Sequence, residues 1–396
     1  MEQALFEAKS REDWAAYFDT LARNRLYFAI DRAEVDGKRR NICPILDVDP
    51  RVAGGRRWAI YTEGMLPAPE PHRVFDWNVL AWFAEVWQPA DPPMIVVNPD
   101  SPCEAFLPSA PPHSAAWAQY TGRTGGPSDK ASLRTLRVGG PLHGPVAHGL
   151  ACGAHLIVHQ GLPWNAMAYH GQGYPAERQM LRRSWGITSR QEWQAQQRAL
   201  LATDGANPVW EFALGLRRAI ARDFGGYVET GYWREAAARV LRRRAEDETV
   251  ITSDGVTRTA ASVPTAETET HIKGVQRLIG RIARYEARMR ADGILGDSQY
   301  VTSADAWDLG RASCMARWGL STRYGTLPEA EAAVVEAGYS AARCYESWQD
   351  FSAGFILGRC LQFDNEKFGS WYEDMVTVHR ILMSDPGSPW LNIPFR

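Results

Sequence analysis

One stretch of the chain, Ser303–Phe363, constrains the fold most strongly, because it contains three consecutive helix start signals. The hydroxyl of Ser303 can accept a hydrogen bond from a free backbone N–H of a first helical turn. Thr326 and Glu329 form a T-x-x-E capping box for a second helix. Ser347 provides the start signal of a third helix. The stretch therefore predicts the centre of a mainly helical body.

Two glycines within the third of these helices indicate close packing. Gly354 and Gly358 are four residues apart and therefore share a face of the helix. Each costs about 1 kcal/mol relative to alanine in a helix interior. We expect this cost to be offset by the close approach of another backbone.

Three residues of the first helix form a candidate polar site. Asp308 and Arg311 are three residues apart, and Trp307 and Arg311 are four apart. An Asp–Arg pair beside an indole can be a ligand clamp, an electrostatic catalytic pair or a buried structural ion pair. Oppositely charged pairs at this spacing are common on helices, which favours the structural interpretation.

A second arginine, Arg359, follows Gly358 in the third helix. The glycine could leave room for an anion, although a solvated or carbonyl-capping arginine is the simpler interpretation. In a functional site, arginine would hold an anion through paired hydrogen bonds, and the aspartate would orient it or act as a base. The candidate ligand-binding residues are Trp307, Asp308, Arg311, Trp348 and Arg359.

The chain of 396 residues is longer than one typical domain, so we expect two or three. With 45% hydrophobic residues it can bury a normal core, and its 16 tryptophans favour packed helix junctions. The formal net charge of −2 gives no general attraction to nucleic acid or to anionic membranes. Nucleic-acid binding would have to use a local patch such as Arg239 to Arg244.

The six cysteines are scattered and include no CxxC pair, which is typical of reduced thiols in a cytoplasm. The N-terminal residues MEQALFEAKSREDW are too polar for a signal peptide. No apolar run approaches the roughly 20 residues of a membrane span. We therefore expect a cytoplasmic protein without a membrane partner.

The first 120 residues predict a small α+β domain. Residues 1–24 have the pattern of one amphipathic helix. Strands predicted at 26–30 and 42–48 could form a hairpin around Asp36–Gly37 or be joined by a longer loop. An inner strand is expected at 94–97. For the whole chain we expect an α+β protein, in which a small mixed sheet domain precedes a larger, mainly α-helical domain.

Two runs in the first domain carry a resemblance to a known family. The runs YTEGMLPAPEP and VVNPDSPCEAFLP are similar to the SseB-like (enhanced serine sensitivity) domain, in which a strand leads into a VNP-type turn. The resemblance covers residues 15–115, and Asp100 stands where such motifs often carry glycine. Members of that family are not established enzymes, so the resemblance implies a binding or regulatory module.

The segment 121–140 has the composition of a linker, and we expect the helical domain at 141–396. Four potential zinc ligands would share one helix face near its start. Glycines weaken this helix, and ligands from adjacent turns alone leave a metal site incomplete, so we expect no metal. The four residues are His148, Cys152, His155 and His159.

Two further segments of the helical domain stand out by composition. Residues 247–271 are rich in Thr, Ser and Ala and have few large apolar residues, so we expect an exposed or flexible insertion. The C-terminal segment SPWLNIPF is apolar, so we expect it to dock on the helical body through Trp390, Leu391, Ile393 and Phe395.

Three motifs of the second half occur in a fixed order, SWGITSRQEW, AWDLGRASCMARWG and ESWQDFSAGFILGR. This order resembles an uncharacterised bacterial domain family typified by the YbeU and YbeR proteins, over residues 180–364. The family has no assigned reaction, so the resemblance implies a fold and not a function. Its signature falls on Trp185, Gly186, Ile187, Trp307, Asp308, Arg311, Trp348, Phe351, Gly358 and Arg359.

The sequence contains none of the common catalytic or nucleotide-binding motifs that we tested. No GxGxxG follows a predicted strand, and GxxxxGK[ST], HExxH and GxSxG do not occur. We therefore expect no cofactor.

Two functions remain open from the sequence. The first is a cytoplasmic protein-binding or regulatory module, such as an immunity or accessory protein of a bacterial toxin or secretion system, whose partner is another protein. The alternative is an enzyme of unrecognised class that acts on a small anionic ligand at the Asp/Arg/Trp site. The missing catalytic motifs and the SseB-like resemblance favour the first.

Overall fold

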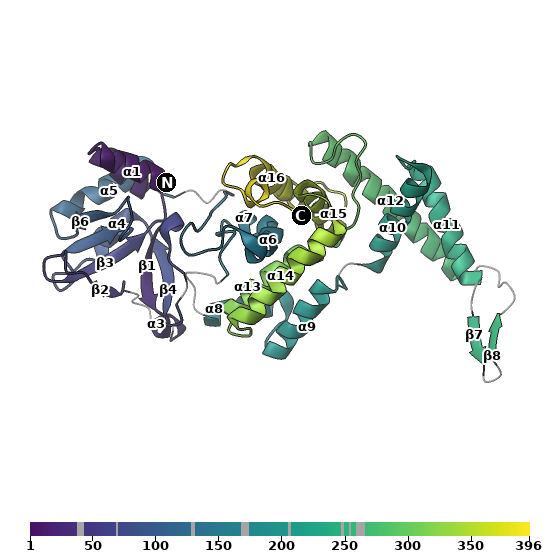
Figure 1. Cartoon of the computed structure of the whole chain (residues 1–396), viewed down its shortest axis with the longest axis horizontal. Helices are drawn as coiled ribbons and strands as arrows, with labels where there is room; N and C mark the ends of the chain where they lie inside the picture. Colours follow the sequence, from purple (N-terminus) through teal and green to yellow (C-terminus); the bar gives the residue numbers. More distant parts are fainter. Residues whose placement is uncertain are drawn as a thin grey trace.

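The computed structural model describes residues 1–37, 43–68, 70–127, 131–167, 174–204, 207–246, 249–252, 255–258 and 266–396. An N-terminal domain built on one mixed sheet is followed by a mainly helical region (Figure 1). This arrangement confirms the predicted α+β fold class.

The sheet of the N-terminal domain has the strand order β4-β1-β3-β5-β6, with β2 paired to β3. The pairing of β3 with β5 is parallel, with Trp58 opposite Ile95, and the other pairings are antiparallel. The strands are β1 Leu26–Asp31, β2 Leu46–Val48, β3 Arg56–Tyr61, β4 Arg73–Asn78, β5 Met94–Val97 and β6 Ala105–Pro108.

The two faces of the sheet have different coverings. Side chains alternate along a strand, so Phe28 and Ile30 face one side and Tyr27 and Ala29 face the other. The first side packs against helices, and the second packs against Leu136 and other residues that lead to the helical region. The covering helices are α1 Glu2–Ser10, α2 Trp14–Ala22, α4 Leu80–Val86 and α5 Trp117–Thr124.

One prediction for the N-terminal domain is wrong, and one of two alternatives is decided against. The helix expected at 1–24 is divided into α1 and α2, because Glu12 adopts a positive φ of 55° and Asp13 caps α2. Of the two connections left open at Asp36–Gly37, the described residues favour the longer one over the hairpin, since β1 pairs with β3 and β4 and is followed by a short helix, α3 Arg32–Asp36.

The connection between the two regions is held against the sheet. Asn165 accepts a hydrogen bond from the backbone N of Leu136 at 2.8 Å and donates one to its carbonyl at 2.6 Å. Leu136 itself is fully buried. The predicted linker, 121–140, begins inside α5, and its residues 128–130 lie outside the described residues.

The helical region is organised around α13 Ala306–Ser321 and α15 Trp348–Phe363, which pack on each other and are almost entirely buried. Helices α6, α7, α8, α9 and α14 also pack on α13, and α12 and α16 pack on α15. Their bounds are α6 Gly144–Cys152, α7 Ala154–His159, α8 Tyr174–Trp185, α9 Arg190–Leu201, α12 Ala266–Ala291, α14 Leu327–Cys344, α16 Ser370–Ser384 and α17 Pro389–Asn392.

The start signals of the central stretch are mostly confirmed. Thr326 and Glu329 form both bonds of the capping box, and Ser347 caps α15 through the backbone N of Asp350. The start signal predicted at Ser303 is displaced, because α13 starts at Ala306 and its N-cap residue is Asp305. The Ser303 hydroxyl instead accepts a hydrogen bond from the backbone N of Asp305.

The C-terminal segment docks on the helical body, as predicted. The indole of Trp348 donates to the carbonyl of Ile393 at 2.9 Å, and that of Trp390 donates to the carbonyl of Ala151 at 3.1 Å. Trp390, Ile393 and Phe395 are buried, whereas Leu391 is half exposed.

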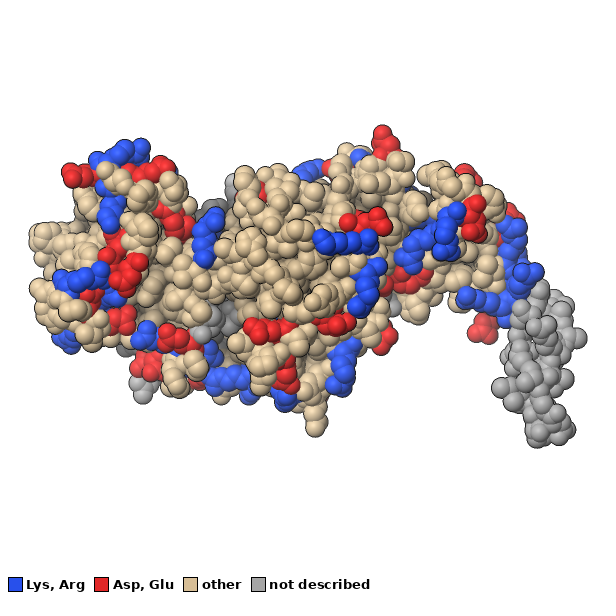
Figure 2. Space-filling view, in the orientation of Figure 1, with Lys and Arg blue, Asp and Glu red and all other residues tan. Residues whose placement is uncertain are grey.

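Three helices form an arm at the end of the molecule farthest from the sheet (Figure 1). They are α10 Pro208–Phe224, α11 Thr230–Glu246 and α12, and we call them the basic arm. Basic side chains lie close together over α11 (Figure 2). The predicted insertion 247–271 lies partly outside the described residues. Its described parts are the paired strands β7 Thr249–Thr252 and β8 Gly255–Arg258 and the start of α12.

Within the described part of the chain, no helix is both long enough and apolar enough to cross a membrane.

The close packing of α15 can be tested at Gly354. A Cβ added there would lie 2.5 Å from the carbonyl oxygen of Ser303, so we expect Gly354→Ala to lower the free energy of unfolding by about 1–3 kcal/mol. Gly274→Ala in α12 is the matched control, because its Cβ would meet no atom within 4 Å. Urea denaturation of both variants checks this, and equal stability of the two would contradict the packing argument.

Candidate functional site

Asp308 and Arg311 form a buried ion pair on α13. Asp308 has no exposed surface, and the Arg311 side chain is 14% exposed. The Arg311 Nε also donates to the carbonyl of Trp307 at 3.2 Å. Burial lowers the pKa of Arg311, and the charge of Asp308 opposes that shift. Because each buried charge is compensated by the other, this geometry supports the structural interpretation of the pair.

Arg359 on α15 is only 6% exposed, so the interpretation of a solvated arginine is wrong. Its guanidinium lies 4.8 Å from the ring centre of Trp371 and 5.9 Å from that of Trp307. Burial lowers its pKa, while Cys360 and Asp374 raise it. Its Nε has no hydrogen-bond acceptor among the residues that the structure describes.

These side chains form a continuous stack of alternating indoles and guanidinium groups. Arg311 lies 5.6 Å from the ring centre of Trp185 and 4.4 Å from that of Trp307, and Arg359 continues the series to Trp371. We call these five residues the Trp–Arg stack. Cation–π contacts of desolvated groups are each worth up to about 2 kcal/mol. The stack therefore joins α8, α13, α15 and α16.

Three other signature residues lie beside this stack or just after helix α8. A Cβ at Gly358 would lie 2.5 Å from the Cβ of Trp307, so glycine lets the indole lie against α15. Gly186 has a positive φ of 70° just after α8, and Ile187 is buried beside Trp193.

Trp348 and Phe351 belong to a different cluster. The Trp348 ring stacks on Trp390 at 5.7 Å and meets the edge of Phe395 at 4.8 Å, and Phe351 packs beside them. The structure thus brings Trp307, Asp308, Arg311 and Arg359 together, and uses Trp348 to hold the C-terminal segment.

The four potential zinc ligands do not converge. His148 binds the carbonyl of Phe395 at 2.9 Å, and His159 lies 4.0 Å from the carboxylate of Asp374. Cys152 is a buried thiol that contacts the carbonyl of His148. Among the described residues, no group of three or more His, Cys, Asp or Glu could hold a metal ion.

A serine lies between two histidines in the core. The Ser352 Oγ is 2.9 Å from the Nε2 of His155 and 2.7 Å from the Nδ1 of His379. Burial lowers the pKa of His379 to about 4 and also lowers that of His155. Ser352 and His155 have no exposed surface, and His379 is 5% exposed. A substrate could not reach Ser352 without unfolding this region, so the trio is structural.

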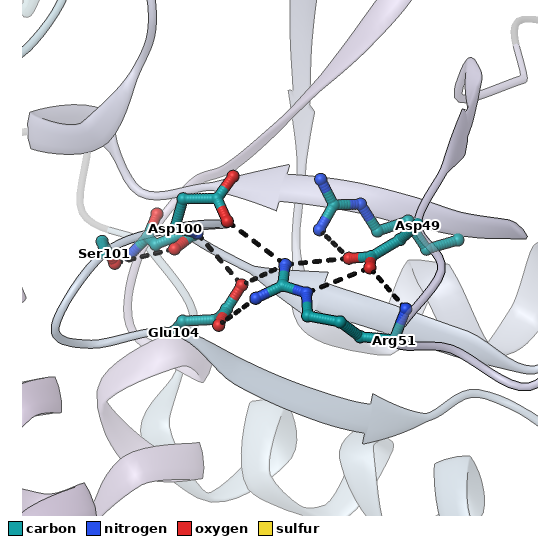
Figure 3. Close-up of polar contacts among 7 residues, drawn as sticks. Asp49, Arg51, Asp100, Ser101 and Glu104 are labelled. Carbon is teal, nitrogen blue, oxygen red and sulfur yellow. Dashed lines mark hydrogen bonds and ion pairs between the residues drawn. The ribbon is translucent and has the colours of Figure 1, made fainter. Parts of the chain in front are cut away.

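The turn in VVNPDSPCE is held by ion pairs and hydrogen bonds between charged side chains (Figure 3). Arg51 forms paired hydrogen bonds with Glu104, at 2.9 and 3.0 Å, and with Asp49, also at 2.9 and 3.0 Å. Asp49 additionally accepts from Arg57 at 2.5 Å. Asp100, at a positive φ of 60°, lies 3.3 Å from Arg51. The network ties the β2–β3 loop to the β5–β6 turn through three carboxylates that share two arginines.

The basic arm was not predicted from the sequence, where only the run Arg239 to Arg244 was named, as the local patch that nucleic-acid binding would have to use. Three aromatic side chains at the turn between α10 and α11 are exposed by 72% (Phe224), 68% (Tyr227) and 42% (Tyr232). Behind them, Arg217 forms a buried bidentate pair with Glu286 at 2.6 and 2.7 Å. The signal in the sequence was the run DFGGY followed by TGYW, which places aromatics beside glycines.

The Asp308–Arg311 pair gives a direct test of its role. Asp308→Ala leaves the guanidinium of Arg311 buried without its counter-charge, so we expect the free energy of unfolding to fall by about 3–5 kcal/mol. Adding Arg311→Leu should recover part of this loss. Chemical denaturation of both variants checks this. If Asp308→Ala is as stable as the wild type, the pair is not structural.

The Asp49 network makes the stability of the sheet domain depend on pH. The hydrogen bond from Arg51 lowers the pKa of Asp49 to about 2, below the value of about 3.9 expected in an unfolded chain. Its contribution is therefore complete above about pH 4 and is lost as the pH falls toward 2.

We expect Asp49→Asn to be less stable than the wild type at pH 7, with a difference that shrinks between pH 4 and pH 2. Urea denaturation at several pH values measures this, with the exposed Asp297→Asn as control. A difference independent of pH would contradict the argument.

Comparisons with known proteins place the helical region in a family. The family described as "Protein of unknown function (DUF1266)" matches residues 180–395, which is more than half of the chain. No match was found among curated proteins or among solved structures. The matched range contains the Trp–Arg stack and most of the helices around α13 and α15. The chain therefore belongs to the DUF1266 family.

Proposed function

We propose that this protein is a non-catalytic binding and regulatory module, which uses the basic arm to bind an acidic surface of another protein. One observation carries the proposal. Helices α10, α11 and α12 together hold 14 Lys and Arg and seven Asp and Glu, a net charge of +7, whereas the whole chain carries −2. The remainder of the chain therefore carries −9. Such a separation of charge favours a partner of opposite sign at the arm.

Some of these positive charges form ion pairs inside the arm, and others remain exposed at its surface. Arg217 is neutralised by Glu286, and Arg242 pairs with Glu269 at 2.9 Å. Five basic side chains along α11 and α12 are exposed and available to a partner: Arg239, Arg243, Arg244, Lys273 and Arg277.

The exposed aromatics at the arm's end favour a protein over a nucleic acid as the partner. Aromatic residues and arginine are enriched at protein interfaces, and exposed apolar clusters mark such sites. Phe224 meets the edge of Tyr232 at 5.8 Å, and Arg239 lies over the Tyr232 ring. A long polyanion would also approach the acidic remainder of the chain, whereas a protein contact can be confined to the arm.

The resemblance to SseB-like and YbeU/YbeR-like domains fits this proposal, since the former implies a binding or regulatory role. An accessory or immunity role in a bacterial toxin or secretion system, acting in the cytoplasm, is consistent with it. The alternative is an enzyme whose active site contains Asp308 and Arg311. The burial of this ion pair argues against it, because Asp308 has no exposed surface that a substrate could reach.

A photo-cross-linking experiment in the native host tests the arm. A photoreactive phenylalanine at position 227 should cross-link a protein, and the same group at Tyr339, which is 55% exposed on α14, serves as control. The cross-linked protein, once identified and purified, should bind about tenfold or more weakly to the Arg239→Glu/Arg243→Glu variant and should lose affinity with added salt.

Three outcomes would contradict the proposal. They are cross-linking no stronger than at position 339, a cross-linked species that is nucleic acid, or a partner whose affinity does not respond to the charge reversal. A cross-link to a second copy of this chain would show self-association instead.

A further inference from the structure

A polar cleft lies where the sheet domain meets the helical region, far from the basic arm. Its volume is about 420 Å³, within the range of small-molecule sites. Its walls come from the turn between α2 and β1, the 3-10 helix Glu63–Met65, the connecting segment around Arg134, and the loop after α16. Together with Met1 and Glu2 at the N-terminus, five separate segments therefore build one concave site.

Arginines dominate the charge of this cleft. Arg23 and Arg25 come from the α2–β1 turn, and Arg134 and Arg137 come from the connecting segment. The Arg134 side chain is only 10% exposed, whereas Arg23 and Arg137 are exposed at the rim. Arg25 is fixed with its guanidinium 4.4 Å from the ring centre of Trp77.

Two of the cleft carboxylates, those of Glu2 and Asp385, accept hydrogen bonds from neutral donors. The Oε1 of Glu2 accepts hydrogen bonds from the hydroxyl of Thr62 at 2.8 Å and from the backbone N of Gly64 at 3.0 Å. Asp385 accepts from the backbone N of Gly387 at 2.8 Å. Both carboxylates are thus engaged by local donors.

Among the residues that the structure describes, Glu63 is the carboxylate paired with the deep arginine, Arg134. Its Oε1 is 3.4 Å from the Nη1 of Arg134 and accepts a hydrogen bond from the hydroxyl of Tyr27 at 2.7 Å. Burial raises the pKa of Glu63, and Arg134 opposes that shift. The floor of the cleft therefore presents a guanidinium beside a carboxyl group.

The position of Arg134 is fixed by the helical region. Its backbone carbonyl accepts from the backbone N of Trp164 at 2.9 Å. The carbonyls of Pro163 and Trp164 in turn accept from Arg317 on α13, at 3.0 and 3.1 Å. The backbone bonds and the side-chain contact with Glu63 restrict Arg134 before a ligand binds, which lowers the entropy cost of binding.

We propose that this cleft binds a small organic anion that carries a phosphate or carboxylate group together with a hydroxyl donor. The planar guanidinium of Arg134 binds the anionic group through paired hydrogen bonds, and the rim arginines attract it. Glu63 accepts from the donor group of the same ligand. This inference is independent of the arm and of its partner.

Isothermal titration calorimetry of the full chain tests the proposal with three probes. Glycerol 3-phosphate and malate carry both the anionic group and a hydroxyl, and glycerol lacks the charge. We expect one or both anions to bind and glycerol not to bind. Preference between the two anions identifies the phosphate or the carboxylate as the recognised group.

Variants locate the binding in the cleft. Arg134→Gln should weaken binding at least about tenfold, and the rim variant Arg137→Gln should weaken it by a smaller factor. Arg137→Gln keeps its backbone bond to the carbonyl of Gly64, so it remains informative if Arg134→Gln fails to fold. Arg56→Gln removes the same charge at an exposed position of β3 and should bind like the wild type.

Two results would overturn the inference. The first is no binding of either anion to the wild type at about 10 mM, a concentration that would detect even a site of millimolar affinity. The second is anion binding that is unchanged in Arg137→Gln and Arg134→Gln, which would place the anion elsewhere on the molecule.

Discussion

The contact between α13 and α15 is the constraint on which most of the helical region depends. A Cβ at Gly310 would lie 2.6 Å from the ring of Phe355, and one at Gly358 would lie 2.5 Å from the Cβ of Trp307. The two helices approach this closely only because these positions lack side chains. The neighbouring helices pack on this pair, so its spacing fixes their positions as well. The Trp–Arg stack then connects α13 and α15 to α8 and α16 through the largely buried guanidinium groups of Arg311 and Arg359.

Buried charge also connects this core to the sheet domain. Arg317 on α13 is 5% exposed, and burial lowers its pKa to about 10. It is satisfied by the carbonyls of Pro163 and Trp164, and the next residue, Asn165, holds the backbone of Leu136 against the sheet. A buried guanidinium without these carbonyls would be costly, so the connecting segment and α13 stabilise each other.

The parts of the fold that could be predicted from the sequence depend on short-range interactions. The capping box of Thr326 and Glu329 involves residues three apart, and the cap of Ser347 on Asp350 has the same short spacing. The sequence could not decide between a hairpin and a longer connection at Asp36–Gly37, because strand pairing is non-local. Strand β1 finds its partners in β3 and β4, some 30 to 50 residues away in sequence, and the turn signal carries no information about them.

The same distinction applies to the candidate sites. The contact of Arg311 with Trp307 follows from helical spacing and was predicted, but the contacts with Trp185 and Trp371 require the tertiary fold. The cleft arginines come from segments that are linked only through the folded connection, and no spacing in the sequence relates Arg25 to Arg134. Residue types alone could not distinguish Arg134 in a cleft from any exposed arginine.

The core pair of helices also lies between the two surfaces on which function is proposed. The arm is attached through α12, which packs on α15, and through Glu366, which pairs with Arg284. The cleft is attached through Arg317 of α13. Protein interiors are close-packed, so α13 and α15 cannot shift relative to each other without moving both attachments. The motif residues Trp307, Arg311 and Gly358 are therefore best understood as the scaffold that sets the geometry of distant surfaces, which explains why residues so distinctive in the sequence are buried.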